Sequence, residues 1–211
     1  MNKFETLKWE NNELILIDQR VLPTSEEYVV CKTVDDVATA IENMVVRGAP
    51  AIGCSAAFGF AIGVIEAIEK SKITNNCSVE HHKNFIKFFQ LVNKSRARLA
   101  RTRPTAVNLF WALSKMNDTL DLNIHLKSNE LTSKIITKAK NIFYGDIEAN
   151  QKIGNHGAGL LSKSSKILTH CNAGALATAG HGTALGIVRS AHNQGKKIEV
   201  FAGETRPFLQ G

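Results

Sequence analysis

The chain has 211 residues, of which 44% are hydrophobic and 21% are charged. This composition is typical of a soluble globular protein whose core needs no disulfide staples. The formal net charge of +7 favours an anionic partner, and leaves a phosphorylated metabolite, a nucleic acid and an acidic membrane all open.

The cysteines indicate a reducing compartment, which we take to be the cytoplasm. They form no CxxC pair and have no regular spacing, so a disulfide framework is not expected. The first ten residues mix charges and lack the apolar stretch of a secretory signal. The four cysteines are Cys31, Cys54, Cys77 and Cys171.

The beginning of the chain predicts β-structure. Short runs at 7–9 and 13–18 flank the dipeptide Asn11-Asn12, which suits a hairpin turn. A third strand is expected over 27–32. The three runs together predict a small sheet at the N-terminus.

Two helices follow this sheet. Thr33 is expected to cap the first, because Asp36 three residues later completes a capping box. The segment 47–50 interrupts this helix, and Pro50 suits the first turn of the next one. Residues 51–68 are long and apolar enough to imitate a membrane span. Their many small residues favour a buried core helix instead, because these give little energy of transfer into lipid.

Further helices are predicted over 84–100, from 107 and over 129–153, with a break at Pro104. Basic residues gather before and around that break. Without interleaved aromatic residues, they indicate a solvated helix face more than a nucleic-acid site. The cluster is Lys94, Arg96, Arg98, Arg101 and Arg103.

Beyond residue 153 the pattern changes to strand, Gly-rich turn, helix and strand, which opens a doubly wound parallel sheet. The fold class is therefore α/β, with a small β plus helical-bundle domain over 1–153 and an incomplete Rossmann-like domain over 154–211. A single βαβ unit leaves unpaired strand edges, so we expect a truncated chain or completion by another chain. The glycines expected to mark the junction are Gly154, Gly157 and Gly159, followed by a strand over 166–171, a helix over 183–193 and a strand over 198–202.

Cys171 is the first candidate for chemistry, because it ends a predicted parallel strand at the edge where such sheets bind ligands. A thiol there can exchange protons if its surroundings tune it, although a buried apolar role is the plain alternative. His170 and His181 flank it. The other histidines are scattered, and no metal-ligand spacing is present.

Three segments suit a phosphate. The turn from Gly174 to Gly182 can offer backbone amides at a helix start, although it also suits a simple tight connection. As a nucleotide fingerprint with Glu204 it is weak, because the spacing is not GxGxxG. Arg47 and Arg103 each precede a helix start, where a guanidinium and the helix dipole attract phosphate together; solvated turn arginines are the alternative.

Four long stretches carry a family resemblance: VVRGAPAIG at 45–53, RPTAVNLFWAL at 103–113, ILTHCNAGALATAGHGTALG at 167–186 and VFAGETRPFLQG at 200–211. With these the chain resembles the methylthioribose-1-phosphate isomerases over essentially its whole length. The same superfamily holds ribose-1,5-bisphosphate isomerases and regulatory subunits of a translation-initiation exchange factor.

The resemblance implies an aldose–ketose isomerase of methionine salvage, which converts 5-methylthioribose 1-phosphate to 5-methylthioribulose 1-phosphate without metal or organic cofactor. Cys171 would be one member of the acid–base pair. The family's other member, a downstream Asp, is not found here, so we expect a fragment that is inactive when purified alone. The substrate would be held by Arg47, Gly48, Ala49, Arg103 and Gln210.

The expected partners are a sugar phosphate and either a second copy in a homodimer or a complementing chain, with no nucleic acid and no membrane. The alternative is a non-catalytic regulatory or phosphometabolite-binding subunit of the same superfamily. Cys171 separates the two, because a binder has no need of its thiol.

Overall fold

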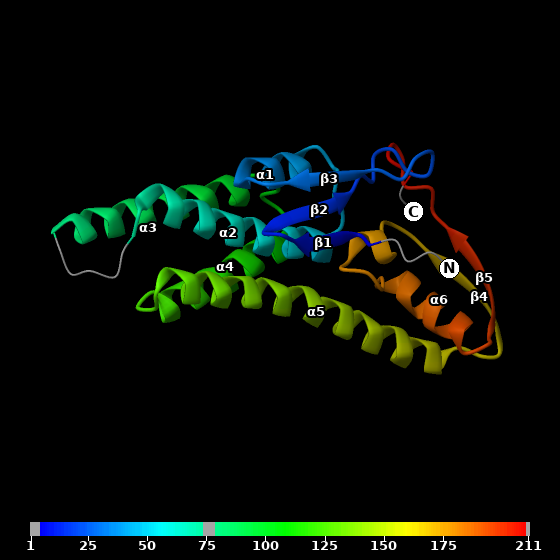
Figure 1. Ribbon diagram of the computed structural model, residues 1–211. Helices are drawn as coiled ribbons and strands as arrows, with labels where there is room; N and C mark the ends of the chain where they lie inside the picture. The colour runs from blue at the N-terminus through cyan, green and yellow to red at the C-terminus, as the bar shows by residue number, and fades with distance from the viewer. Residues whose placement is uncertain (1–4, 74–78, 210–211) are drawn as a thin grey trace.

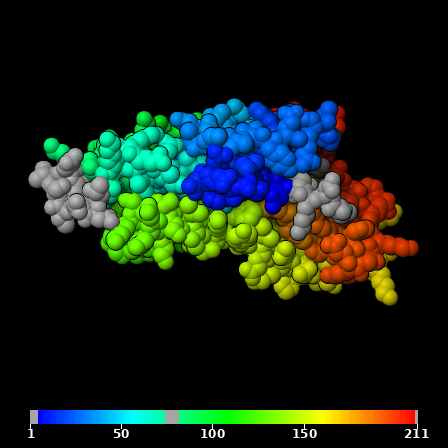
Figure 2. All heavy atoms as spheres, viewed as in Figure 1, coloured from blue at the N-terminus to red at the C-terminus, as the bar shows by residue number. Residues whose placement is uncertain are grey.

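The computed structural model describes residues 5–73 and 79–209. Its elements form an elongated molecule, with a helical bundle at one end and a small parallel α/β unit at the other (Figure 1). In the space-filling view the C-terminal segments, orange to red, gather at the end away from the bundle (Figure 2).

The N-terminal sheet contains β1 (Leu7–Glu10), β2 (Glu13–Ile17) and β3 (Tyr28–Cys31), paired antiparallel in that order. Asn11 and Asn12 have φ of 51° and 62°, the two positive values that a tight hairpin turn needs. The predicted hairpin is confirmed. Leucines on one face of this sheet are fully buried against the helices, which fixes its register.

Five helices form the bundle: α1 (Val34–Glu42), α2 (Ala49–Ser71), α3 (Val79–Ala100), α4 (Val107–Asn123) and α5 (Ser128–Leu160). Thr33 caps α1 through the predicted capping box with Asp36. On α3, Arg98 bonds to Asp35 and Glu42 of the α1 helix. That arginine therefore joins two helices, whereas the sequence predicted a mostly solvated face.

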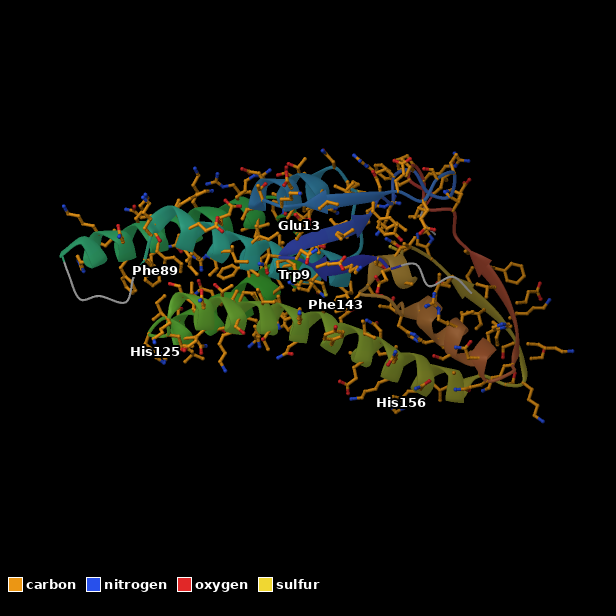
Figure 3. All side chains as sticks on the ribbon, in the orientation of Figure 1. Trp9, Glu13, Phe89, His125, Phe143 and His156 are labelled. Carbon is orange, nitrogen blue, oxygen red and sulfur yellow. The ribbon has the colours of Figure 1, made fainter. Side chains whose placement is uncertain are left out.

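The α2 helix is the centre of the bundle and packs against the other four helices. By length and composition it is apolar enough to cross a membrane, but 83% of its most apolar 18-residue window is buried inside this molecule. Trp9 of β1 stacks on Phe58 of α2, with ring centroids 4.9 Å apart, and Phe143 of α5 contacts the same ring (Figure 3). The prediction of a core helix is confirmed.

The α5 helix continues to Leu160, so the predicted helix end at Ile153 is wrong. The glycines that suggested a junction instead permit close packing. A Cβ at Gly154 would lie 2.5 Å from the Ser190 hydroxyl, and one at Gly157 would lie 2.6 Å from Ile187. The boundary proposed between 153 and 154 therefore falls within one continuous helix, while the division into two domains stays a prediction.

The C-terminal unit contains β4 (Ser164–Thr169), the 3-10 turn η1 (Ala175–Ala177), α6 (Ala184–Asn193) and β5 (Lys197–Ala202). The strands β4 and β5 are parallel, as predicted, and α6 packs between this sheet and α5 (Figure 1). The carboxyl ends of both strands lie at the same edge of the sheet. This edge faces the region where the N-terminal sheet and the start of α2 meet.

Candidate functional site

Arg47 lies in the short connection that precedes α2, and its side chain is only 8% exposed. Its Nη2 donates to the main-chain oxygen of Gln19 at 2.7 Å. Burial lowers the pKa of the guanidinium, and the nearby Asp18 carboxylate opposes that shift. The group remains a cation held in a poorly solvated place, where its attraction for an anion is strengthened.

Gly48 brings this connection against the turn that follows Cys171. It has φ of +96°, and a Cβ there would lie 2.5 Å from Cα of Ala177 in η1. Only glycine permits both the backbone conformation and the approach. Ala49 then begins α2, with Pro50 in its first turn as predicted. The fold thus places three predicted substrate residues against the segment after Cys171.

Two polar side chains beside the N-terminal sheet, one directly before β1 and one shortly after β2, hold η1 in this place. Thr6 Oγ1 donates to the oxygen of Ala175 at 2.8 Å, and Gln19 Nε2 donates to the oxygen of Leu176 at 2.7 Å. Both side chains are nearly inaccessible to solvent. The contact between the two ends of the molecule is therefore specific hydrogen bonding as well as packing.

Arg103 lies near the same connection. Its Nη1 is 3.4 Å from the sulfur of Met44, which stands three residues before Arg47. The guanidinium thus approaches the entry to α2 from the loop before α4. Arg103 therefore contacts the segment that leads into the Arg47 connection.

Cys171 is exposed and follows β4 by two residues, at the carboxyl edge of the parallel sheet. Its φ of 71° is left-handed, a conformation that costs a non-glycine residue energy and often accompanies a functional site. The two other cysteines in the described ranges, Cys31 and Cys54, are buried. Burial raises the pKa of Cys31 to about 12. Accessibility therefore singles out Cys171 among these three thiols.

The Gly-rich turn differs from the predicted phosphate cradle. Its amides mostly donate to acceptors of the protein itself. The amide of Ala179 donates to Oδ2 of Asp146 at 2.7 Å, and those of Gly180 and Gly182 donate to the Thr178 hydroxyl. Just after the turn, the main-chain amides of Thr183 and Leu185 donate to the oxygen of Ala173. These five amides are satisfied internally, which contradicts their use as phosphate donors.

Asp146 of α5 was not among the predicted residues. It accepts the Ala179 amide and also a bond from Asn150 at 3.0 Å, and burial raises the pKa of its carboxyl. A signal was present, because Asp146 continues the helical stripe of Ile135, Ala139 and Ile142 into the core. An acid on a core stripe must find buried donors.

Gln19 was also missed. It stands in a polar Asp-Gln-Arg run directly after the buried strand β2. Asp18 in this run accepts bonds from the Arg20 side chain at 2.8 and 2.6 Å, and these bonds foremost hold the pKa of that carboxyl below its usual range. A polar run that ends a buried strand was the available signal.

The remaining predicted residues have ordinary places. His181 bonds to Ser190 at 3.2 Å against α5, and burial and Arg189 lower its pKa. Glu204 forms an ion pair with Arg206. Gln210 lies outside the described residues. Within residues 5–73 and 79–209, no group of three His, Cys, Asp or Glu side chains is placed to hold a metal ion.

The chain is similar to known proteins over nearly its whole length. A family profile described as "Initiation factor 2 subunit family" matches residues 45–211. A curated relative named methylthioribose-1-phosphate isomerase from Thermosipho africanus is 52% identical over 209 residues, which is 99% of this chain and 56% of the relative. One of the same name from Petrotoga mobilis is 50% identical over 210 residues, 99% of this chain and 57% of the relative.

Solved structures share the fold. The crystal structure of 5-methylthioribose 1-phosphate isomerase from Pyrococcus horikoshii has a TM-score of 0.84 at 36% identity, over 100% of this chain and 55% of that one. The crystal structure of translation initiation factor eIF-2B, subunit delta, from A. fulgidus has a TM-score of 0.80 at 37% identity. The match covers 99% of this chain and 57% of that one. The chain thus spans little more than half the length of these proteins.

Proposed function

This chain belongs to the initiation factor 2 subunit family, and we propose that within the family it serves sugar-phosphate isomerisation, the conversion of 5-methylthioribose 1-phosphate to 5-methylthioribulose 1-phosphate. Relatives about half identical to it bear the name of that isomerase. The observation that carries the proposal is the close contact of Gly48 with Ala177, which joins the Arg47 connection to the turn after Cys171.

Arg47 and Arg103 hold the phosphate in this proposal. Arg47 is fixed by its bond to Gln19, so little reorganisation is needed when an anion arrives. The start of α2 adds the positive end of a helix of 23 residues. Gly48 and Ala49 permit close approach of the ligand to the backbone there. Gln210 is retained as a further proposed contact.

Cys171 acts in the proton transfers. The phosphate on the anomeric oxygen of the substrate prevents free ring opening, so an acid must protonate the ring oxygen before hydrogen moves from C2 to C1. The reaction is an isomerisation and needs no net oxidant or reductant. A positioned acid–base group typically accelerates such a reaction about 10²–10⁴-fold. The resemblance assigns the second group to an Asp outside the region matched here.

We propose a second copy in a homodimer or a complementing chain as the protein partner, and the cytoplasm as the compartment. The competing function is a regulatory or metabolite-binding subunit without chemistry. The likeness to the eIF-2B delta subunit is the specific observation that favours it. The exposed Cys171 at the sheet edge favours the isomerase.

The test combines residues 1–211 with the separately expressed C-terminal remainder of the Thermosipho africanus relative and follows turnover of 5-methylthioribose 1-phosphate by NMR. The relative's own two halves serve as the positive control. We expect turnover from the mixture, none from the 211-residue chain alone, and none after Cys171→Ser. Equal turnover with Cys171→Ser would overturn the catalytic role, and binding without turnover would favour the regulatory subunit.

A further inference from the structure

Three buried side-chain atoms have no hydrogen-bond partner within the described ranges: Oε1 of Gln19, Nε of Arg47 and Nδ2 of Asn172. Buried polar groups are almost always paired, because an unpaired one costs free energy. Two of these atoms belong to residues in direct contact, since the main-chain oxygen of Gln19 accepts a bond from Arg47, while Asn172 follows Cys171 in the chain. The unpaired atoms of Gln19 and Arg47 point to a ligand that supplies the missing partners.

Gln19 joins the two halves of this site. Its main-chain amide donates to the oxygen of Val45 at 3.1 Å, and its main-chain oxygen accepts Nη2 of Arg47 at 2.7 Å. Its side-chain Nε2 donates to the oxygen of Leu176 at 2.7 Å. The residue is 2% exposed, so packing holds it in this arrangement.

The orientation of the Gln19 carboxamide follows from its neighbour. The oxygen of Leu176 can only accept, so the amide nitrogen must face it and Oε1 must face the other way. Oε1 is therefore a fixed, neutral acceptor. It can take a hydrogen bond only from a donor such as a hydroxyl group.

We propose that Gln19 is a ligand-binding residue whose Oε1 accepts a hydrogen bond from a hydroxyl of the sugar. This inference rests on the proposed function and deepens it. Arg47 Nε is a donor and suits the anionic part of the same ligand, whereas Gln19 suits the hydroxyl-bearing part. A neutral amide is apt there, because a carboxylate would repel a phosphate nearby.

The test measures the binding of 5-methylthioribose 1-phosphate and of inorganic phosphate to the 211-residue chain by calorimetry. Gln19→Met keeps the length of the side chain and removes both its acceptor Oε1 and the Nε2 donor that bonds to Leu176. We expect sugar-phosphate affinity to fall about three- to tenfold, the size of one hydrogen bond, with phosphate affinity changed less than twofold. Gln151→Met, on the exposed face of α5, is the matched control and leaves both affinities unchanged.

The outcomes separate the two proposals. If the wild-type chain binds both ligands and Gln19→Met weakens both equally, Gln19 only supports η1; this inference then fails while the proposed function stands. If the wild-type chain binds neither ligand, the proposed function fails as well. If Gln19→Met does not fold, the inference is tested by NMR on the wild-type chain instead. The resonance of the Gln19 side-chain amide must then shift when the sugar phosphate is added and stay in place when inorganic phosphate is added. A resonance that the sugar phosphate does not move overturns the inference.

Discussion

Gly48 and Ala177 are in direct backbone contact: a Cβ placed on Gly48 would lie 2.5 Å from Cα and 2.6 Å from the oxygen of Ala177. This single contact brings the connection before α2 against the turn after β4. The proposed function draws its residues from both segments, so this contact is its geometric basis.

Gly48→Ala is expected to destabilise the chain by about 2–4 kcal/mol, because the new Cβ meets the backbone of Ala177 and φ of +96° is strained for alanine. Urea unfolding measures the change. Gly145→Ala is the matched control, since a Cβ at that position in α5 meets nothing within 4 Å. It should stabilise the chain by about 0.5–1 kcal/mol through helix propensity. Equal effects of the two substitutions would show that the contact is unimportant.

Asp146→Ala removes the acceptor of the Ala179 amide and of Asn150. We expect a loss of about 1–2 kcal/mol in unfolding free energy, reduced because the variant also removes the cost of a half-buried carboxylate. Hydrogen exchange at the Ala179 amide should accelerate in the same variant. Asp118→Ala, on the exposed face of α4, is the control and should stay within about 0.5 kcal/mol. Unchanged exchange at Ala179 would contradict the anchoring role.

The lowered pKa of Asp18 predicts that the free energy of unfolding depends on pH. Its bonds to Arg20 hold its folded-state pKa below the usual value, so the ionised carboxylate stabilises the fold. That stabilisation is fully present above the unfolded-state pKa of about 4 and is lost as pH falls through the lower folded-state pKa.

Asp18→Asn should therefore cost about 1 kcal/mol or less at pH 7, because half-exposed Arg20 keeps the pair screened. The difference from wild type should shrink as the pH falls below about 4 and vanish only below the lower folded-state pKa of Asp18. Unfolding midpoints across pH 2.5–7 measure it. A difference that stays constant over this range would rule out the carboxylate charge as its cause.

Local signals predicted much of the fold. The Asn11-Asn12 turn, the Thr33 cap and the apolar length of α2 each rest on nearby residues, and the structure confirms them. The end of α5 could not be predicted in the same way. Glycine usually weakens a helix, so Gly154 suggested a helix end. Only the structure shows that α6 packs so closely at this position that a Cβ would meet Ser190.

The candidate site was predicted in part. The positions of Arg47, Gly48 and Cys171 beside helix starts and strand ends were visible in the sequence. The sequence did not show that amides of the Gly-rich turn donate to acceptors within the protein. The amide of Ala179, for example, donates to Asp146, which lies on a distant helix. Gln19 was missed for the same reason, since its partner Leu176 lies far along the chain.

The most direct test of the shared site is the alkylation rate of Cys171 by iodoacetamide, followed by peptide mass spectrometry in a Cys77→Ser background. Cys31 and Cys54 are buried and should stay unmodified in the folded chain. With millimolar 5-methylthioribose 1-phosphate we expect Cys171 to react at least about fivefold more slowly, and Arg47→Ala should remove this protection. A Cys171 rate unaffected by the sugar phosphate would contradict a common site for the thiol and the arginine.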